Sequence, residues 1–165
     1  METDPSRRRD SGIRAVVLTT SEVRERILAE HRRLRRQLID VQVSAREAVL
    51  EPLTLALLRA RLRTLLVEFA MHLDSEEELL IPVLTGIDAW GPLRVLELKE
   101  EHEGQRNLIK DMLARAEREE SAETLAAEAD ALVLRIFRDM REEEDGILRE
   151  EMLHDDVVVV DQCGG

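Results

Sequence analysis

Apolar side chains recur every three or four residues along four long stretches of the chain. In the first stretch they fall at Val23, Ile27, Leu34, Leu38 and Val41. Similar series begin near Pro52, at residues 91–92 and after Ser121. Because steps of three and four residues keep side chains on one face of a helix, the pattern predicts four amphipathic helices.

The predicted helix starts contain residues that favour helix initiation. Thr19 and Glu22 have the spacing of a capping box, in which each side chain bonds the backbone of the other residue. Pro52 suits the first turn of a helix because its backbone angle is already close to helical. Pro82 lacks a backbone N–H, so the second helix is expected to end or kink near Pro82 or Gly86.

Four helices joined by short connections favour an all-α fold, an antiparallel up-down-up-down four-helix bundle. We expect this bundle to occupy residues 19–153. Residues 1–18 are polar and rich in arginine, which predicts a disordered N-terminal lead. Residues 154–165 form a C-terminal tail with a β-prone VVVV run, for which the sequence offers no partner strand.

The composition supports a single helical domain. The 165 residues include seven glycines, four prolines, two phenylalanines, one tryptophan and no tyrosine, which suits helices better than sheets. The single cysteine excludes an internal disulfide and any Cys-x-x-Cys motif. A net charge of −12 argues against a nucleic-acid partner, because phosphate binding needs basic surfaces. No run resembles a membrane span or a secretory signal, so we expect a cytoplasmic protein without a membrane partner.

Polar side chains interrupt the apolar stripe of each predicted helix. The first helix has His31 at such a position, the second His72 and Glu76, the third His102 and the fourth Glu144. At about 1.5 Å of rise per residue, their distances from the helix ends agree to within about one turn. We therefore expect all five side chains to meet in one layer of the bundle core.

A layer of buried imidazoles and carboxylates is costly unless its groups are paired or bind a cation. A single histidine on an apolar stripe is usually a hydrogen-bonded core residue. Three inward histidines at one depth, together with two inward glutamates, instead favour a metal site. Four-helix bundles build such sites from side chains on facing helices.

The sequence around the second helix resembles a known family. The segment FAMHLDSEEELLIP at residues 69–82 is similar to the second helix of hemerythrin-like, or HHE cation-binding, domains. In that helix a His-x-x-x-Glu pair precedes a short apolar run and a proline. Ala-Glu-His at residues 29–31 and Glu-Glu-His-Glu at residues 100–103 resemble the first and third helices of the family. The resemblance covers about residues 20–152.

This resemblance implies a centre of two non-heme irons in the bundle core. By the family's pattern, Glu76 and Glu144 would bridge the irons, and His31 and His72 would complete the ligands of one of them. His102 would serve the second iron. The implied cofactor is iron, with one or two ions per chain.

The fourth helix departs from the family's pattern, in which it should also contain a His-x-x-x-Glu pair. When Phe137 and Glu144 are aligned with Phe69 and Glu76, Met140 stands at the position of the histidine. A thioether is a poor ligand for iron, so we expect Met140 to be a packing residue.

Two further positions bear on the second iron. A different register would recruit Asp139 or Glu143, but each is expected to point about 100° away from the inward face. Arg106 stands where oxygen carriers have a second histidine on the third helix. The second iron half-site is therefore expected to be incomplete, and reversible oxygen carriage is not expected.

The resemblance implies a non-heme iron protein in oxygen, redox or iron sensing, or in iron handling, rather than in bulk oxygen transport. Dioxygen or a related small molecule would be its ligand. An enzymatic role is expected less but stays open. Two alternatives stay open: a degenerate, metal-free bundle that acts as an interaction module, and a di-iron oxidase or peroxidase. Metal content after expression in iron-replete medium distinguishes iron binding from the metal-free bundle.

Overall fold

The computed structural model describes residues 18–118, 121–153 and 155. Its helices are α1 (Thr20–Leu50), α2 (Leu55–Ile87), α3 (Gly91–Ala116) and α4 (Ala122–Asp145), with a short 3₁₀ helix, η1 (Pro52–Thr54), between α1 and α2. The described residues contain no strand, so the expected all-α fold is confirmed. The predicted disordered lead and C-terminal tail lie almost entirely outside the described residues.

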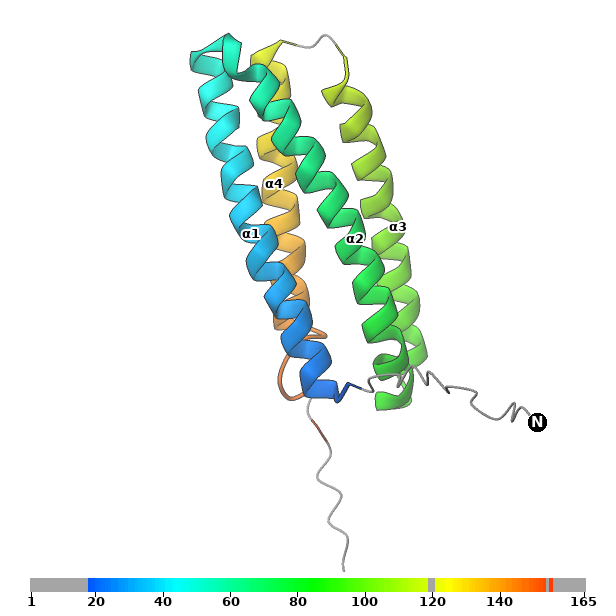
Figure 1. The fold of residues 1–165 in the computed structure, drawn as a ribbon. Helices are drawn as coiled ribbons and strands as arrows, with labels where there is room; N and C mark the ends of the chain where they lie inside the picture. Colours follow the sequence, from blue (N-terminus) through cyan, green and yellow to red (C-terminus); the bar gives the residue numbers. More distant parts are fainter. Residues whose placement is uncertain (1–17, 119–120, 154, 156–165) are drawn as a thin grey trace, which may run out of the picture.

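The four helices lie side by side, and successive helices run in opposite directions (Figure 1). Helix α1 packs against both α2 and α4, and α2 also packs against α3. The arrangement is the antiparallel four-helix bundle expected from the sequence. Within the described part of the chain, no helix is both long enough and apolar enough to cross a membrane.

Local caps determine where α1 and α4 begin. The predicted capping box is present at α1: Thr19 Oγ1 accepts from the Glu22 backbone at 3.2 Å, and Glu22 Oε2 accepts from the Thr19 backbone at 2.8 Å. At α4, Ser121 Oγ accepts from the Thr124 backbone at 3.2 Å. Each cap satisfies N–H groups that the helix itself leaves unpaired and stabilises it by about 1 kcal/mol.

Helix α2 continues past Pro82 and ends at Ile87, next to Gly86, the second of the two positions at which an end was expected. Leu80 and Leu84, on either side of the proline, are fully buried, and their packing keeps this part of α2 helical. The turn into α3 requires a glycine at position 91, because a Cβ atom there would lie 1.9 Å from the Leu84 carbonyl oxygen. This close approach holds the ends of α2 and α3 together.

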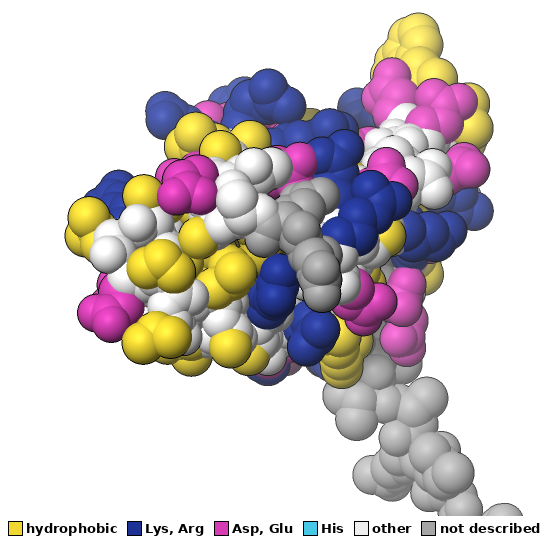
Figure 2. Space-filling model, turned by 90° about the horizontal axis from the view of Figure 1, so that it is seen from above, with side chains coloured by type: hydrophobic (Ala, Val, Ile, Leu, Met, Phe, Trp, Pro, Cys, Tyr) yellow, Lys and Arg dark blue, Asp and Glu magenta, His cyan; other side chains and the backbone are white. Residues whose placement is uncertain are grey.

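A polar layer divides the apolar core into two clusters. Along α1, Leu34 belongs to one cluster and Ile27 to the other, and the fully buried His31 lies between them. The same order, apolar, polar and apolar, recurs on α2 and α3. The outer face drawn in Figure 2 mixes acidic, basic and apolar side chains and shows no histidine. His31, His72 and His102 are at most 4% exposed and therefore belong to the interior of the bundle.

Candidate metal centre

All four helices direct polar side chains into this layer. They are His31 from α1, His72 and Glu76 from α2, His102 from α3 and Glu143 from α4, with exposed fractions of 0, 4, 1, 0 and 8%. His72 and Glu76 are four residues apart and therefore lie on one face of α2. The structure thus brings together the three histidines and the α2 glutamate that the sequence predicted.

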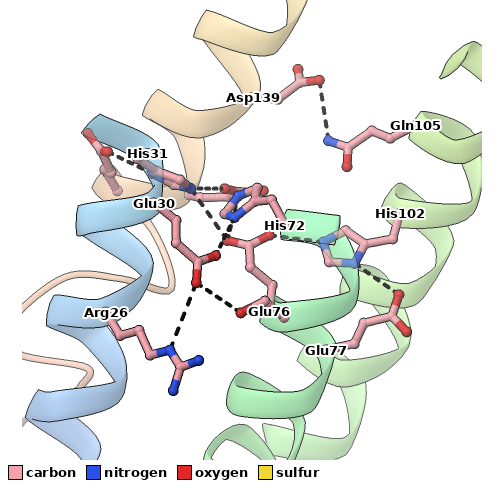
Figure 3. A network of polar contacts seen from close by, with 12 residues as sticks. Arg26, Glu30, His31, His72, Glu76, Glu77, His102, Gln105 and Asp139 are labelled. Carbon is pink, nitrogen blue, oxygen red and sulfur yellow. Dashed lines mark hydrogen bonds and ion pairs between the residues drawn. The ribbon is translucent and has the colours of Figure 1, made fainter. Parts of the chain in front are cut away.

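His31, His72, Glu76 and Glu143 form a cluster in which one ligand atom from each residue lies within 4.8 Å of the others. Figure 3 shows the His31 and His72 rings and the Glu76 carboxylate turned toward one another between α1 and α2. Nitrogen and oxygen donors gathered at this spacing are typical of a site for a first-row divalent metal.

Glu76 lies at the centre of the three histidine rings. Its Oε1 atom is 3.4 Å from Nε2 of His31 and 3.4 Å from Nε2 of His72. Its Oε2 atom is 3.3 Å from Nε2 of His102. On the α4 side, Glu143 Oε2 is 3.2 Å from Nε2 of His31. Every ring therefore turns the same nitrogen, Nε2, toward the centre.

Many of these buried atoms have no hydrogen-bond partner. Among the described residues they include Nε2 of His31 and His102, both carboxylate oxygens of Glu76, and Oε2 of Glu143. Each unsatisfied buried group costs about 1–3 kcal/mol. A cation bound among them would accept their lone pairs together, so the residues present fit a metal ion.

Without a cation, protons hold the cluster together. Burial lowers the pKa of His31, but the Glu143 and Glu76 carboxylates outweigh burial and raise it to about 10. Burial raises the pKa of the Glu143 carboxyl, and the Glu76 charge adds to this rise. Burial acts on Glu76 in the same direction, but His102 and His31 outweigh it and hold the Glu76 pKa below its usual range. A cation entering the cluster must therefore displace protons.

The structure corrects the expected direction of Glu144. Its side chain is 25% exposed and lies at the rim of the layer, where the carboxylate contacts Nδ1 of His31 and the Arg35 guanidinium, each at 2.8 Å. Glu143, which was expected to point away from the inward face, is the α4 carboxylate that reaches the cluster. The inward register of α4 is therefore one residue earlier than expected.

Phe137 is the reason for this error. Its alignment with Phe69 places Glu144 inward, but Phe137 is only partly buried, whereas Ile136 is 1% exposed. The spacing of aliphatic residues along α4 contained the correct signal. The inward series includes Leu125, Leu132, Ile136, Asp139 and Glu143.

Asp139 is a second buried acid on α4, with an exposed fraction of 6%. It precedes Glu143 by four residues, as His72 precedes Glu76, so the inward pair of α4 is Asp-x-x-x-Glu. The side-chain amide of Gln105, itself 2% exposed, donates to the Asp139 carboxylate at 3.4 Å (Figure 3). The expectation that Asp139 points outward is therefore wrong. As for Glu143, the error comes from aligning Phe137 with Phe69.

Met140 and Arg106 occupy the two positions where the sequence analysis expected family histidines. Met140 is 1% exposed within the apolar cluster that also contains Phe69, which confirms it as a packing residue. Arg106 donates to the Glu77 and Asp74 carboxylates, each at 2.7 Å. Helix α3 therefore brings one imidazole, that of His102, into the layer.

A family model described as the hemerythrin HHE cation-binding domain matches residues 23–150 of the chain. No curated protein and no solved structure gives a match. The matched range extends from the first turn of α1 to beyond the end of α4 and includes every residue of the polar layer.

Proposed function

The chain belongs to the hemerythrin HHE cation-binding domain family, and on that basis we propose that it binds non-heme iron in the buried polar layer. The proposed role is oxygen, redox or iron sensing, or iron handling, in the cytoplasm. The observation behind this proposal is the convergence of unpartnered ring nitrogens and carboxylate oxygens on one point of the core.

The first iron would be held by His31, His72, Glu76 and Glu143. Imidazole nitrogens and carboxylate oxygens suit iron, whereas softer metals favour thiolates, which this cluster does not supply. When bound, the iron supplies one-electron redox chemistry and coordination positions open to dioxygen or a related small molecule.

The surrounding side chains keep the cluster dry and its rings in place. Ile27, Leu73 and Leu80 border the layer and are at most 1% exposed. The Phe69 ring stacks on His72 with 6.3 Å between the ring centroids. Since little water competes for the carboxylates, their attraction to a cation is stronger here than at the surface.

The second half-site is proposed to bind metal more weakly. His102 and the Oε2 atom of Glu76 face each other at 3.3 Å and would supply its donors. Arg106 turns away to α2, and the inward residue before Glu143 is Asp139 rather than a histidine. The half-site therefore has one imidazole, and we propose a first iron that binds more tightly than the second.

Anaerobic loading with ferrous iron, followed by removal of excess metal and elemental analysis, tests the proposal. Wild-type protein should retain about one iron or more per chain. His72→Leu should retain far less, because it removes one donor from the cluster. Met140→Leu is the matched control, since it exchanges one buried apolar side chain for another, and its iron content should equal that of wild type. Wild-type protein that is helical but takes up no iron would refute the proposal and favour the metal-free interaction module.

A further inference from the structure

Each of the three buried histidines has a second carboxylate on its outer side. The Nδ1 atoms lie within hydrogen-bond distance of glutamates that are not part of the central cluster. The contacts are 2.8 Å from His31 to Glu144, 2.9 Å from His72 to Glu30 and 3.0 Å from His102 to Glu77. Figure 3 shows Glu30 beside His72 and Glu77 beside His102.

These three outer glutamates follow one rule of placement. Each is adjacent in sequence to a residue of the buried layer but contacts a histidine from a neighbouring helix. Glu30 of α1 contacts His72 of α2, Glu77 of α2 contacts His102 of α3, and Glu144 of α4 contacts His31 of α1. The outer glutamates therefore link α3 to α2, α2 to α1 and α1 to α4.

The outer glutamates are partly exposed, and each lies close to an arginine side chain. Their side chains are 25–28% exposed, and Arg26, Arg106 and Arg35 lie 3.9, 2.7 and 2.8 Å from Glu30, Glu77 and Glu144. Each carboxylate also contacts a histidine, and the Ser75 hydroxyl donates to Glu30 at 3.0 Å. All three are therefore ionised at neutral pH and act as hydrogen-bond acceptors.

An ionised carboxylate can only accept, so a proton stays on the Nδ1 atom that faces it. A neutral imidazole has one N–H, which leaves the lone pair on Nε2, the atom that faces Glu76. We infer that Glu30, Glu77 and Glu144 are positioning residues, which hold the three rings so that each Nε2 lone pair is available to a metal. This inference rests on the proposed metal-binding function.

Arg106 has a specific part in this arrangement. It stands where the family's oxygen carriers have a second histidine, and it donates to the Glu77 carboxylate that contacts His102. Asp74 accepts a second hydrogen bond from the Arg106 guanidinium, and this bond restricts the movement of the arginine side chain. The arginine thus positions the remaining α3 ligand through Glu77.

Zinc titration of the metal-free protein in competition with a chromophoric chelator tests the inference. Glu30→Ala, Glu77→Ala and Glu144→Ala should each weaken zinc binding by about 10–100-fold. Glu68→Ala is the matched control: this glutamate is 23% exposed, pairs with Arg33 and lines the same groove as His72. It removes the same charge at similar exposure, so zinc affinity should change by less than about twofold.

Nitrogen-15 NMR of the histidine rings gives a readout that a merely structural role would not alter. In zinc-loaded wild type, all three rings should carry the proton on Nδ1 and the metal on Nε2. In each zinc-loaded alanine variant, the Nδ1 proton of its own histidine alone should lose its hydrogen-bonded chemical shift and exchange faster with water. The matching Glu→Gln variant should restore most of the affinity because an amide oxygen still accepts.

The outcomes separate the two proposals. If wild type binds zinc and all three alanine variants match Glu68→Ala in affinity and ring protonation, the positioning role is refuted and the metal site stands. If wild type itself binds neither zinc nor ferrous iron, the proposed function and the positioning role are both wrong.

Discussion

The Nε2 atom of His31 lies 3.2 Å from the Glu143 carboxylate across the interface between α1 and α4, and neither atom has a hydrogen-bond partner. Two such groups remain buried together only if a proton or a cation holds them. Glu76 faces the same ring nitrogen at 3.4 Å, so the arrangement concentrates negative charge around one point. The interface between α1 and α4 thus helps to define the candidate metal site.

The register of α4 predicts different effects for two adjacent glutamates. Glu143→Gln removes a charged donor from the cluster and should weaken ferrous binding beyond the roughly 10–100-fold typical of outer residues. Glu144→Gln should keep the iron stoichiometry of wild type, because its carboxylate lies at the rim. Anaerobic iron titration with elemental analysis measures both. The reverse order of effects would show that Glu144 is the ligand.

Asp139→His should increase occupancy of the second half-site. Asp139 is buried and lies four residues before Glu143, so an imidazole there creates an inward His-x-x-x-Glu pair. We expect the iron content to approach two per chain, with absorption from an oxygen-bridged ferric pair after exposure to air. Met140→His is the contrasting variant: it buries an imidazole in an apolar cluster and should cost about 1–3 kcal/mol without added iron. Extra iron in Met140→His alone would contradict the observed register.

The metal-free protein should lose stability as the pH rises above about 6.5. Burial lowers the pKa of His31, but the Glu143 and Glu76 carboxylates outweigh burial and raise it to about 10 in the folded state. Glu144 contacts the other ring nitrogen, Nδ1, at 2.8 Å. Folding therefore binds this proton, and the resulting stability is full below the unfolded pKa and is lost as the pH rises through the folded one. At about 1.4 kcal/mol for each pKa unit, we expect a decrease on the order of 5 kcal/mol between about pH 6 and pH 10.

Urea unfolding of the chelator-treated protein across this pH range measures the effect. His31→Gln should flatten the slope, because its side chain does not titrate. The iron-loaded protein should also lack most of the slope, since a metal-bound ring carries no proton to release from Nε2. An equal slope in His31→Gln would exclude His31 as its origin.

Removal of the metal should lower the melting temperature of wild type. A ligand that binds only the folded state stabilises it by mass action, and at about 100 times its Kd the melting temperature should rise by about 5–10 °C. Circular dichroism melts with and without a chelator measure this difference. His72→Leu should show no chelator effect, and its metal-free melting temperature should equal or exceed that of wild type because a buried polar group becomes apolar.

The sequence by itself determined the elements of the bundle and most of the polar layer. The Thr19 capping box and the three- and four-residue apolar spacing are local signals, and the structure has the cap and the four helices that they predict. His31, His72 and His102 lie within strong apolar stripes, so their inward direction also followed from local spacing. Local signals suffice where a helix buries a wide, continuous face.

Only the tertiary structure decided which α4 carboxylate faces the cluster and which glutamates hold the rings. Each residue along a helix turns the side chain by about 100°, so a small rotation of α4 exchanges Glu143 for Glu144. Packing of Ile136 against the other helices sets that rotation, and the partly buried Phe137 does not. Glu30 contacts a ring on another helix, and the distance between helices that permits this contact depends on the packed core and not on spacing in the sequence.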